Sequence, residues 1–476
     1  MRKLLNLMFQ SLTGQTGSRG AGNGGARAEP RVIPRPDHIV SRKDIPPHAL
    51  KVLYRLNKAG YQSYLVGGGV RDLLLGSEPK DFDVATDARP EQVRKVFSNC
   101  RLIGRRFRLA HVHFGRDIIE VATFRGGSNG EEGAGDVVQD KGGRLLRDNV
   151  YGTMEEDAWR RDFTINGLYY SIDDFSIIDY VGGMEDIERR LIHLIGDVET
   201  RYREDPVRML RAARFAAKLG FDIERDTAEG IGRFAPLLAE IAPARLFDEC
   251  LKLFMAGYGR VTFDLLREYG LFAELFPATE AVLRAEGDDG GSLRLLRQAM
   301  ANTDQRVSEG RPVTPAFLFA ALLWPPVREG LQQRRAEGLS PGEALQRTAA
   351  SEVGAADQRV ALPKRFRIPM REIWQLQPRF ERRQGKRVWH LMGHPRFRAA
   401  YDFLLLRAHA GEVEQELADW WTRVQEVDRG EQETMINAPA PQAREGESAP
   451  ASAPQGRPRR RRRRGGRRRG PPQTES

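Results

Sequence analysis

Two aspartates two positions apart, Asp81 and Asp83, form a pattern that could carry chemistry. The stretch Phe82–Val84 around them is largely apolar, and the sequence predicts a strand there. Because side chains alternate along a strand, both carboxylates should project from one face, with Phe82 on the other. Like charges repel, so such a pair is seldom found without a cation. A pair of Mg²⁺ ions would use both carboxylates, whereas an exposed strand end or an Asx turn would give them no chemical role.

A third acid, Glu120, lies in another predicted strand, Ile118–Thr123, with apolar residues on both sides. A carboxylate in such surroundings is costly to bury unless a cation meets it. The alternative is a charge that protects an edge strand from aggregation. Each alternative is reasonable for one acid. Three acids that follow the glycine-rich turn at Gly67–Gly69 together favour a cation site.

Three successive glycines, Gly67, Gly68 and Gly69, join the predicted strand Ser63–Val66 to the predicted helix Val70–Leu75. Glycine lets backbone N–H groups approach an anion closely, and a helix N-terminus adds a favourable dipole. The turn is therefore a candidate triphosphate cradle, or else a tight turn that binds nothing. It lacks both the Gly-Lys-Ser/Thr of a P-loop and the glycine spacing of a dinucleotide-binding turn.

Both strands and helices must position these residues. Strands are expected where apolar residues alternate, and helices where they recur every three or four residues. The first part of the chain also contains predicted helices at His48–Leu56 and Phe163–Ser171 and predicted strands at His111–Phe114 and Ser176–Tyr180. The glycine-rich stretch Gly126–Gly143 is expected to be a mobile loop.

From about Glu185 onward the pattern is helical. A helix over Asp205–Leu219 keeps apolar residues on one face and should end at Gly220. Proline marks breaks at Pro325–Pro326 and at Leu362–Pro363. Further helices are predicted at Ala244–Met255, Val261–Glu268, Pro315–Leu323, Met370–Leu376 and Phe397–Ala408.

These patterns predict an α+β protein. Residues 1–40 are expected to be disordered, and residues 41–190 to form a head with a mixed sheet. A helical neck over 191–255 and a helical body over 256–428 would follow. Residues 429–476 are expected to be a disordered, arginine-rich tail.

The net charge of +11 is almost wholly a property of this tail, because ten arginines lie between positions 457 and 469. Such a run is typical of an arm that binds nucleic acid, and the alternative is a solvated charge block without a fixed partner. The arginines predicted to contact RNA are Arg459, Arg460, Arg461, Arg462, Arg463, Arg464, Arg467, Arg468 and Arg469.

Two cysteines, Cys100 and Cys250, cannot form a disulfide framework, which suits a reducing compartment. No apolar run reaches the roughly 18 residues of a membrane span. The basic and apolar start, Met1–Leu5, is not followed by a cleavage site of the secretory type. The sequence therefore predicts a cytoplasmic protein.

Three motifs in one order resemble those of a known family. Gly67–Asp72 followed by Asp81–Asp83 is similar to the head motif of the nucleotidyltransferase superfamily that includes DNA polymerase β. Arg160–Asn166 resembles the second motif of the class II tRNA nucleotidyltransferase and bacterial poly(A) polymerase family, and Glu204–Arg208 resembles its base-recognition motif. The resemblance implies a polymerase-β-like head followed by all-helical neck and body domains.

The resemblance also implies a role for each matched residue. The catalytic Mg²⁺ ions, two in number, would be bound by Asp81, Asp83 and Glu120. The triphosphate would be held by Gly67, Gly68 and Arg71, with Asp72 beside them. The incoming nucleotide would contact Arg161 and the catalytic Asp162, and its base would be read by Asp205 and Arg208.

The last two roles have alternatives. Asp205 and Arg208 are three apart, so on one helix they would share a face and offer an acceptor and a planar donor fork to a base. They could equally form an ordinary surface ion pair. Asp162 precedes the predicted helix Phe163–Ser171 and could be its N-cap, with or without a catalytic role.

The activity that follows from the resemblance is template-independent transfer of AMP from ATP to RNA 3′ ends. The expected partners are messenger, small and transfer RNA, with RNA-decay proteins or an RNA chaperone. His111 and His113, two apart on a strand, could face one metal ion, but no nearby cysteine completes a zinc site, so they are expected to pack or to face RNA.

The poly(A) branch is favoured over the CCA-adding branch by two features. The segment Leu102–Val112 resembles the poly(A) branch, and an arginine tail suits sequence-independent holding of a growing RNA. The alternatives are a CCA-adding tRNA nucleotidyltransferase, a non-catalytic RNA-binding protein on the same fold, and an enzyme that modifies a protein or small molecule.

Overall fold

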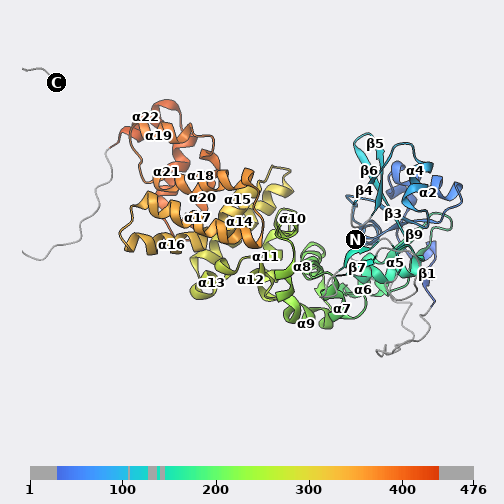
Figure 1. The fold of residues 1–476 in the computed structure, drawn as a ribbon. Helices are drawn as coiled ribbons and strands as arrows, with labels where there is room; N and C mark the ends of the chain where they lie inside the picture. Colours follow the sequence, from blue (N-terminus) through green and yellow to red (C-terminus); the bar gives the residue numbers. More distant parts are fainter. Residues whose placement is uncertain (1–28, 105–107, 127–136, 140–144, 149, 439–476) are drawn as a thin grey trace, which may run out of the picture.

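A mixed sheet of eight strands forms the first part of the chain, and helices form the remainder (Figure 1). The computed structural model describes residues 29–104, 108–126, 137–139, 145–148 and 150–438. The strand order is β1-β10-β9-β2-β3-β6-β5-β4. Within this sheet β3 and β6 pair in parallel, and every other neighbouring pair is antiparallel. The strands are β1 (Arg31–Ile33), β2 (Ser63–Val66), β3 (Asp83–Thr86), β4 (Cys100–Ile103), β5 (Leu109–Phe114), β6 (Asp117–Thr123), β9 (Leu168–Ser171) and β10 (Ile177–Asp179).

Two hydrophobic clusters cover the two faces of this sheet. One contains Leu65, Val84 and Val121 and packs under α2, α3 and α4, and the other contains Val66, Ala85 and Tyr169 and packs under α5. Because side chains alternate along strands, consecutive residues of β2 and β3 serve opposite clusters. The helices and 3₁₀ turns of the head are η1 (Arg35–Asp37), η2 (Arg42–Asp44), α2 (Pro47–Lys58), α3 (Gly68–Leu74), α4 (Pro90–Val96), α5 (Met154–Arg160), η3 (Thr164–Asn166) and α6 (Gly183–Arg189).

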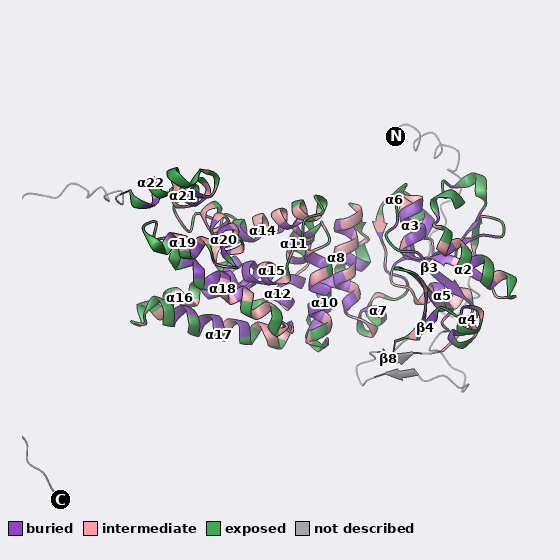
Figure 2. Cartoon of the chain, turned by 90° about the horizontal axis from the view of Figure 1, so that it is seen from above, coloured by how far each residue is buried: buried purple, intermediate pink, exposed green. Residues whose placement is uncertain are grey.

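The helices that follow extend away from the sheet in a row, with their buried faces turned inward (Figure 2). The neck contains α7 (Val198–Glu204), α8 (Val207–Leu219), α9 (Arg225–Phe234), η4 (Ala235–Glu240) and α10 (Pro243–Phe254). The body contains α11 (Gly259–Glu268), α12 (Leu271–Leu275), α13 (Pro277–Glu286), α14 (Gly291–Ser308), α15 (Pro315–Leu322), α16 (Trp324–Ala336), α17 (Pro341–Arg359), α18 (Lys364–Phe380), α19 (Lys386–Met392), α20 (Phe397–His409), α21 (Gln415–Glu426) and α22 (Arg429–Asn437).

One continuous hydrophobic core runs from the edge of the head through the neck and into the body. It begins at Phe163 and Ile165, includes Met209 in α8, and continues to Phe403 in α20. A smaller core around Trp421 joins the C-terminal helices. Because the first core crosses the boundary between head and neck, the two are packed together rather than merely linked.

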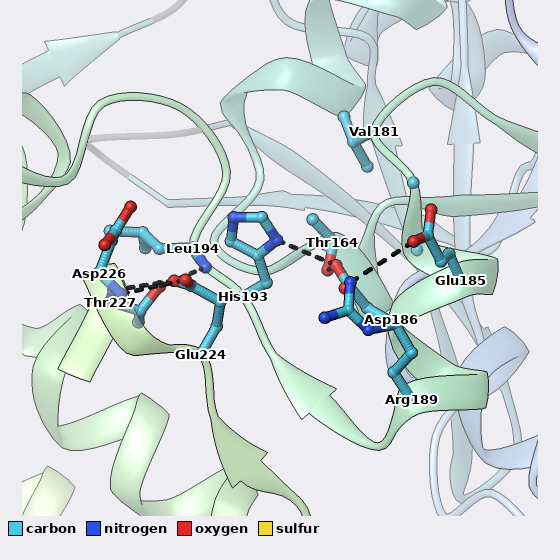
Figure 3. Close-up of polar contacts among 12 residues, drawn as sticks. Thr164, Val181, Glu185, Asp186, Arg189, His193, Leu194, Glu224, Asp226 and Thr227 are labelled. Atoms are coloured by element: carbon cyan, nitrogen blue, oxygen red, sulfur yellow. Dashed lines mark hydrogen bonds and ion pairs between the residues drawn. The ribbon is translucent and has the colours of Figure 1, made fainter. Parts of the chain in front are cut away.

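Polar contacts reinforce that boundary (Figure 3). The Thr164 hydroxyl donates to Asp186 Oδ2 at 2.6 Å, and His193 Nδ1 lies 3.2 Å from the same oxygen. The Thr164 N–H donates to the His193 carbonyl, and the Leu194 N–H donates to the Thr227 hydroxyl at the start of α9. The segment after Asp162 is therefore tied to both α6 and the neck.

Most predicted elements are confirmed near their expected ends, but the helix expected over Phe163–Ser171 is wrong. Thr164–Asn166 is a short 3₁₀ turn, and Leu168–Ser171 is the central strand β9, buried between β2 and β10. A short apolar run has no period that separates a buried strand from a helix.

Other differences concern the ends of the predicted segments. Residues 31–33, expected to be disordered, pair with β10, and 429–437, expected in the tail, form α22. Part of the stretch predicted as a mobile loop, 126–143, forms β7 (Val137–Gln139), which pairs with β8 (Leu145–Asp148). The remainder of that stretch is outside the described residues, except Gly126. A further small pair joins β11 (Leu191–Ile192) to β12 (Asp222–Ile223).

Candidate active site

The carboxylates of Asp83 and Glu120 lie on neighbouring strands. Asp83 is the first residue of β3, and in the parallel β3–β6 pair it stands directly opposite Glu120. Burial raises the pKa of Asp83 to about 6, and the charges of Glu120 and Asp81 add to the rise, while Arg161 opposes it. Asp83 itself remains accessible from the cavity. The two acids form a concentration of negative charge, with the guanidinium of Arg161 as the opposing charge.

Asp81 occupies a different position from the one expected. It precedes β3 instead of lying on it, is exposed, and is not among the residues that line the cavity described below. Its charge still reaches Asp83. The structure therefore brings two of the three predicted carboxylates together on strands and leaves the third beside them.

A cavity of about 380 Å³ separates these acids from the neck. Its floor includes Val66 and Ala122 of the sheet. Its charged lining consists of seven arginines and five acids, which gives an excess of positive charge: Arg125, Arg160, Arg161, Arg201, Arg208, Arg211, Arg245, Asp83, Glu120, Asp157, Asp162 and Asp205. A polyanion is the kind of ligand that such a lining attracts.

Crowding of these arginines shows in their pKa values. Burial lowers the pKa of Arg160 to about 10, and the neighbouring Arg125 adds to the fall. Burial also lowers the pKa of Arg201 to about 10, again with help from a second guanidinium, that of Arg208. An anion placed among them would relieve this repulsion, so the cavity favours phosphate groups.

Arg161 is held at the junction of α5 and β9. Its guanidinium donates to Asp157 Oδ2 at 2.9 Å and to the Tyr169 hydroxyl at 3.1 Å, and the same hydroxyl donates to Asp157. Burial lowers the pKa of Arg161, but Tyr169 and Asp157 outweigh burial and raise it. The side chain is therefore a permanently charged, fixed group in the cavity wall, as its predicted contact with a nucleotide requires.

Asp162 is an acceptor for two parts of the chain. Its Oδ1 accepts from the Phe163 N–H at 2.9 Å and from the Asn166 amide at 3.0 Å, and its Oδ2 accepts from Arg211 Nε of α8 at 2.7 Å. Burial alone would raise the pKa of Asp162, but Arg211 and these hydrogen bonds hold it well below its usual range. The helix that Asp162 was expected to cap does not form, so the capping interpretation is wrong.

The glycine turn lies beside Arg161. Gly67 has φ +75°, which favours glycine, and a Cβ there would be 3.5 Å from the Arg161 guanidinium. A Cβ at Gly69 would be 3.3 Å from the Asp81 carbonyl oxygen, so the turn packs closely against the acidic segment. Gly68 begins α3.

Arg71 and Asp72 lie behind this turn rather than in the cavity lining. Arg71 is 2% exposed and donates to Asp72 Oδ1 and to the Asn166 amide oxygen. Asp72 Oδ2 accepts from Lys218 of α8 at 2.9 Å. The pair thus links the turn, the segment around Asn166 and the neck, and direct contact with a triphosphate stays a prediction.

Asp205 and Arg208 both line the cavity, but not as members of one helix. Asp205 lies between α7 and α8 with an extended backbone (φ −152°), and α8 begins only at Val207. Asp205 Oδ2 accepts from Arg245 of α10 at 2.7 Å, and Arg208 donates to Glu204 at 2.9 Å. Proline at 206 separates the two helices, which the helical spacing did not show.

Of the four neck arginines in the cavity lining, sequence reasoning singled out Arg208 and missed Arg201, Arg211 and Arg245. A usable pattern was present: Arg201, Glu204, Arg208 and Arg211 are spaced three or four residues apart, the period of one helical face. Arg245 had no such pattern, because it arrives from α10, some 40 residues away in the chain.

The donors suit a divalent cation. Within the described ranges, no group of three or more His, Cys, Asp or Glu side chains is gathered as a metal site. Mg²⁺ commonly takes one or two protein carboxylates and completes its shell with water and substrate phosphates. Asp83 and Glu120 provide that number, and burial and the neighbouring charge of Glu120 raise the pKa of Asp83. The residues present therefore fit a bound Mg²⁺ ion.

Three family models match the chain. "Poly A polymerase head domain" matches residues 63–193, "Probable RNA and SrmB- binding site of polymerase A" matches 220–283, and "Polymerase A arginine-rich C-terminus" matches 337–469. The CCA-adding enzyme of Bacillus stearothermophilus, solved in complex with CTP, has the same fold: it is 27% identical, with a TM-score of 0.53 over 80% of this chain and 82% of that one. The sheet with its paired acids and the helical neck thus define a nucleotidyltransferase.

The branch follows from the relatives. Poly(A) polymerase I of Salmonella typhi is 55% identical over 427 residues, which cover 88% of this chain and 92% of the relative. The CCA-adding enzyme of Bacillus pumilus is 39% identical over 229 residues, which cover only 48% of this chain and 54% of that protein. The chain belongs to the bacterial poly(A) polymerase I family, as its motifs predicted.

Proposed function

We propose that this protein transfers AMP from ATP to the 3′ hydroxyl of RNA without a template, and that it does so repeatedly to build a poly(A) tail. The observation that carries the proposal is the opposition of Asp83 and Glu120 across β3 and β6, at the edge of a cavity with seven arginines. Acids for a metal-dependent attack and cations for a triphosphate meet in one place.

In the proposed reaction the 3′ oxygen of RNA bonds to the α-phosphorus of ATP and its proton passes to solvent. The bond from that phosphorus to the bridging oxygen breaks, and pyrophosphate leaves. Asp83 and Glu120 would hold Mg²⁺, with Asp81 beside them; the ion when bound lowers the pKa of the attacking hydroxyl and neutralises the departing phosphates. Two ions are proposed, as in other two-metal transfers.

The chain's own groups position the nucleotide. Arg161 sits beside Gly67 and would bind the triphosphate, with Gly68 and the buried pair Arg71 and Asp72 fixing the turn behind it. Asp162 accepts a hydrogen bond from Arg211 and so links the head to the neck at the cavity wall. Such fixed groups need little rearrangement as charge develops, which is how positioned donors accelerate a transfer.

Choice of base is proposed for the neck. Asp205 provides a carboxylate and Arg208 a planar donor fork, and both face the cavity. Their partners, Arg245 and Glu204, would hold them in orientations suited to the adenine edge. Without a template strand, a protein surface of this kind must select ATP.

The proposed substrates are messenger, small and transfer RNA. The arginines at 459–464 and 467–469, outside the described residues, are proposed to bind the RNA backbone. The match of 220–283 to an RNA- and SrmB-binding model supports a second contact, with RNA or with an RNA-associated protein. Among the described residues no helix is long and apolar enough to cross a bilayer. Both cysteines are buried and unpaired, and we propose a cytoplasmic location.

The test uses purified protein, a generic RNA primer and each nucleoside triphosphate separately. Long products with ATP alone are expected. Products formed only on tRNA that lacks its 3′ end, with CTP needed before ATP, would instead indicate a CCA-adding enzyme. No incorporation of any nucleotide would leave the non-catalytic alternative.

A further inference from the structure

The head sheet continues for two strands beyond the paired acids, and its side chains form a row across them. Asp83 of β3 stands opposite Glu120 of β6, Glu120 opposite His111 of β5, and His111 opposite Arg101 of β4. Neighbouring strands are about 4.8 Å apart, so the row extends about 14 Å from Asp83 to the edge of the sheet. The acids thus stand at one end of a surface that leads to the sheet edge.

This part of the sheet face is partly exposed and partly apolar. Ile118, two residues before Glu120, is 45% exposed and stands opposite His113, and Ile103, two residues after Arg101, is 41% exposed. Single exposed apolar residues are common on protein surfaces, but these two share one face of the sheet, on the strands that flank β5. The opposite face of β5 and β6 is buried in the core through Ala110, Val112, Ile119 and Val121.

The polar groups of the row are suited to a nucleotide chain. Arg101 is exposed and takes part in none of the ion pairs of the described residues, so its charge is available to a phosphate. The His111 and His113 rings lie 6.4 Å apart. His111 Nε2 is 3.2 Å from Glu120 but makes no hydrogen bond in the described part of the chain. Bases stack on flat rings and on apolar side chains whatever their identity.

We propose that these five residues, Arg101, Ile103, His111, His113 and Ile118, form a platform that holds the 3′-terminal nucleotides of the RNA being extended. The inference rests on the proposed function. In an in-line transfer the attacking oxygen and the leaving pyrophosphate lie on opposite sides of the phosphorus. None of the five platform residues lines the cavity that holds the neck arginines, and Glu120 belongs both to that cavity and to the row. RNA held on the platform would bring its 3′ hydroxyl to the acids along the sheet, beside the cavity proposed for the triphosphate.

Stacking also explains how one surface can accept any RNA end. Hydrogen bonds to base edges would select a sequence, whereas ring and methyl surfaces bind every base. A poly(A) tail that grows by one residue at a time must release and rebind its end after each addition. A flat, sequence-tolerant platform allows that movement, and a closed pocket would not.

The first test compares Ile118→Ser and His113→Ala with a matched control, Ile368→Ser, because Ile368 in α18 is 63% exposed and far from the sheet. The KM for a short RNA at saturating ATP, the KM for ATP at saturating RNA and the melting temperature are measured. We expect a roughly tenfold rise in the KM for RNA in the platform variants. The KM for ATP and the melting temperature should stay unchanged, and the control should match the wild type.

An unchanged KM for RNA in both variants would overturn the proposal, as would an equal rise in both KM values together with a lower melting temperature. A second experiment uses the wild-type protein and an RNA with a photoreactive thiouridine at its 3′ end. Cross-links within residues 100–123 are expected, and cross-links confined to the body would contradict the platform. A wild type that extends no RNA would contradict the proposed function, whereas normal extension without cross-links at 100–123 would contradict only this inference.

Discussion

The two walls of the cavity are built in different ways. On the head side, Asp83 and Glu120 project from neighbouring strands, and backbone hydrogen bonds set their register. On the neck side, Arg208 and Arg211 of α8 and Arg245 of α10 are held by carboxylates. Backbone hydrogen bonds between strands fix which residues stand opposite one another, whereas ion pairs between helices depend on how those helices pack. We infer that the head wall determines the rate of transfer and the neck wall determines which nucleotide is bound.

The largest effect is expected from Asp83→Asn. Loss of this carboxylate removes half of the paired acids, so AMP transfer should fall by about a thousandfold, the scale seen when one electrostatic group is removed from an active site. ATP affinity, measured by equilibrium dialysis, should change little because the arginines remain. Asp117→Asn is the matched control, since Asp117 begins the same strand as Glu120 but is exposed and outside the cavity lining. Transfer within tenfold of the wild type would disprove the assignment of Asp83.

Arg211→Met should mainly lower the free energy of unfolding. Asp162 would keep its buried charge without the guanidinium that pairs with it, at a cost of about 3 kcal/mol in the free energy of unfolding. Urea denaturation measures this loss. The double variant with Asp162→Asn should recover much of the stability, because the unpaired charge is gone. Additive losses in the double variant would show that the two side chains do not act as a pair.

Arg208→Ala should alter nucleotide choice more than rate. Hydrogen bonds that read a base contribute roughly 1–3 kcal/mol of discrimination, so the preference for ATP over CTP should fall by about tenfold or more. Competition between labelled ATP and CTP measures the ratio. Arg203→Ala is the control, because Arg203 is an exposed residue of the neighbouring helix α7 and pairs with Glu199. An unchanged ratio would assign base choice to other residues of the neck.

The smallest effect concerns pH. The pKa of Asp83 is raised to about 6, so in the absence of metal ions the folded state holds this proton more tightly than the unfolded state does. The stability that the protonated group contributes is present below about pH 4 and is lost as the pH rises through 6. Above pH 6 in EDTA, Asp83→Asn should therefore be more stable than the wild type, by about 1 kcal/mol because solvent screens the exposed part of the group.

Addition of Mg²⁺ should remove this difference, because the cation compensates the paired charges only in the wild type. Thermal unfolding of both proteins at pH 5 and pH 7, with and without Mg²⁺, gives the difference in stability between them under four conditions. A wild type whose stability relative to Asp83→Asn is the same at both pH values would contradict the charge repulsion inferred for the pair.

The same division between head and neck explains what the sequence could predict. Strands β2, β3 and β6 were expected because their apolar residues alternate and their acids stand in a pattern that local chemistry explains. The glycine turn was expected because three successive glycines join a predicted strand to a predicted helix, and in the structure Gly67 adopts a backbone conformation that few other residues adopt. These features depend on a few neighbouring residues, and so a single sequence contains them.

The features that were missed depend on packing between distant segments. Leu168–Ser171 is a central strand only because β2 and β10 pair with it on either side. Asp205 leaves the predicted helix because Pro206 starts a new one, and its partner Arg245 comes from α10. The hydrogen bonds that the Arg71 guanidinium donates to Asp72 and Asn166 were not expected either, and its contact with a triphosphate stays a prediction. A local sequence pattern does not show which distant residues such side chains contact in the fold.

The separate roles of the two walls, rate for the head and nucleotide choice for the neck, are tested most directly by single-turnover transfer from ATP and from CTP to one RNA. The variants compared are Asp83→Asn and Arg208→Ala. We expect the residual activity of Asp83→Asn to keep the wild-type preference for ATP at a greatly reduced rate. Arg208→Ala should lose that preference while its rate with ATP stays within about tenfold of the wild type. The reverse result, with choice lost in the head variant and rate lost in the neck variant, would contradict the account.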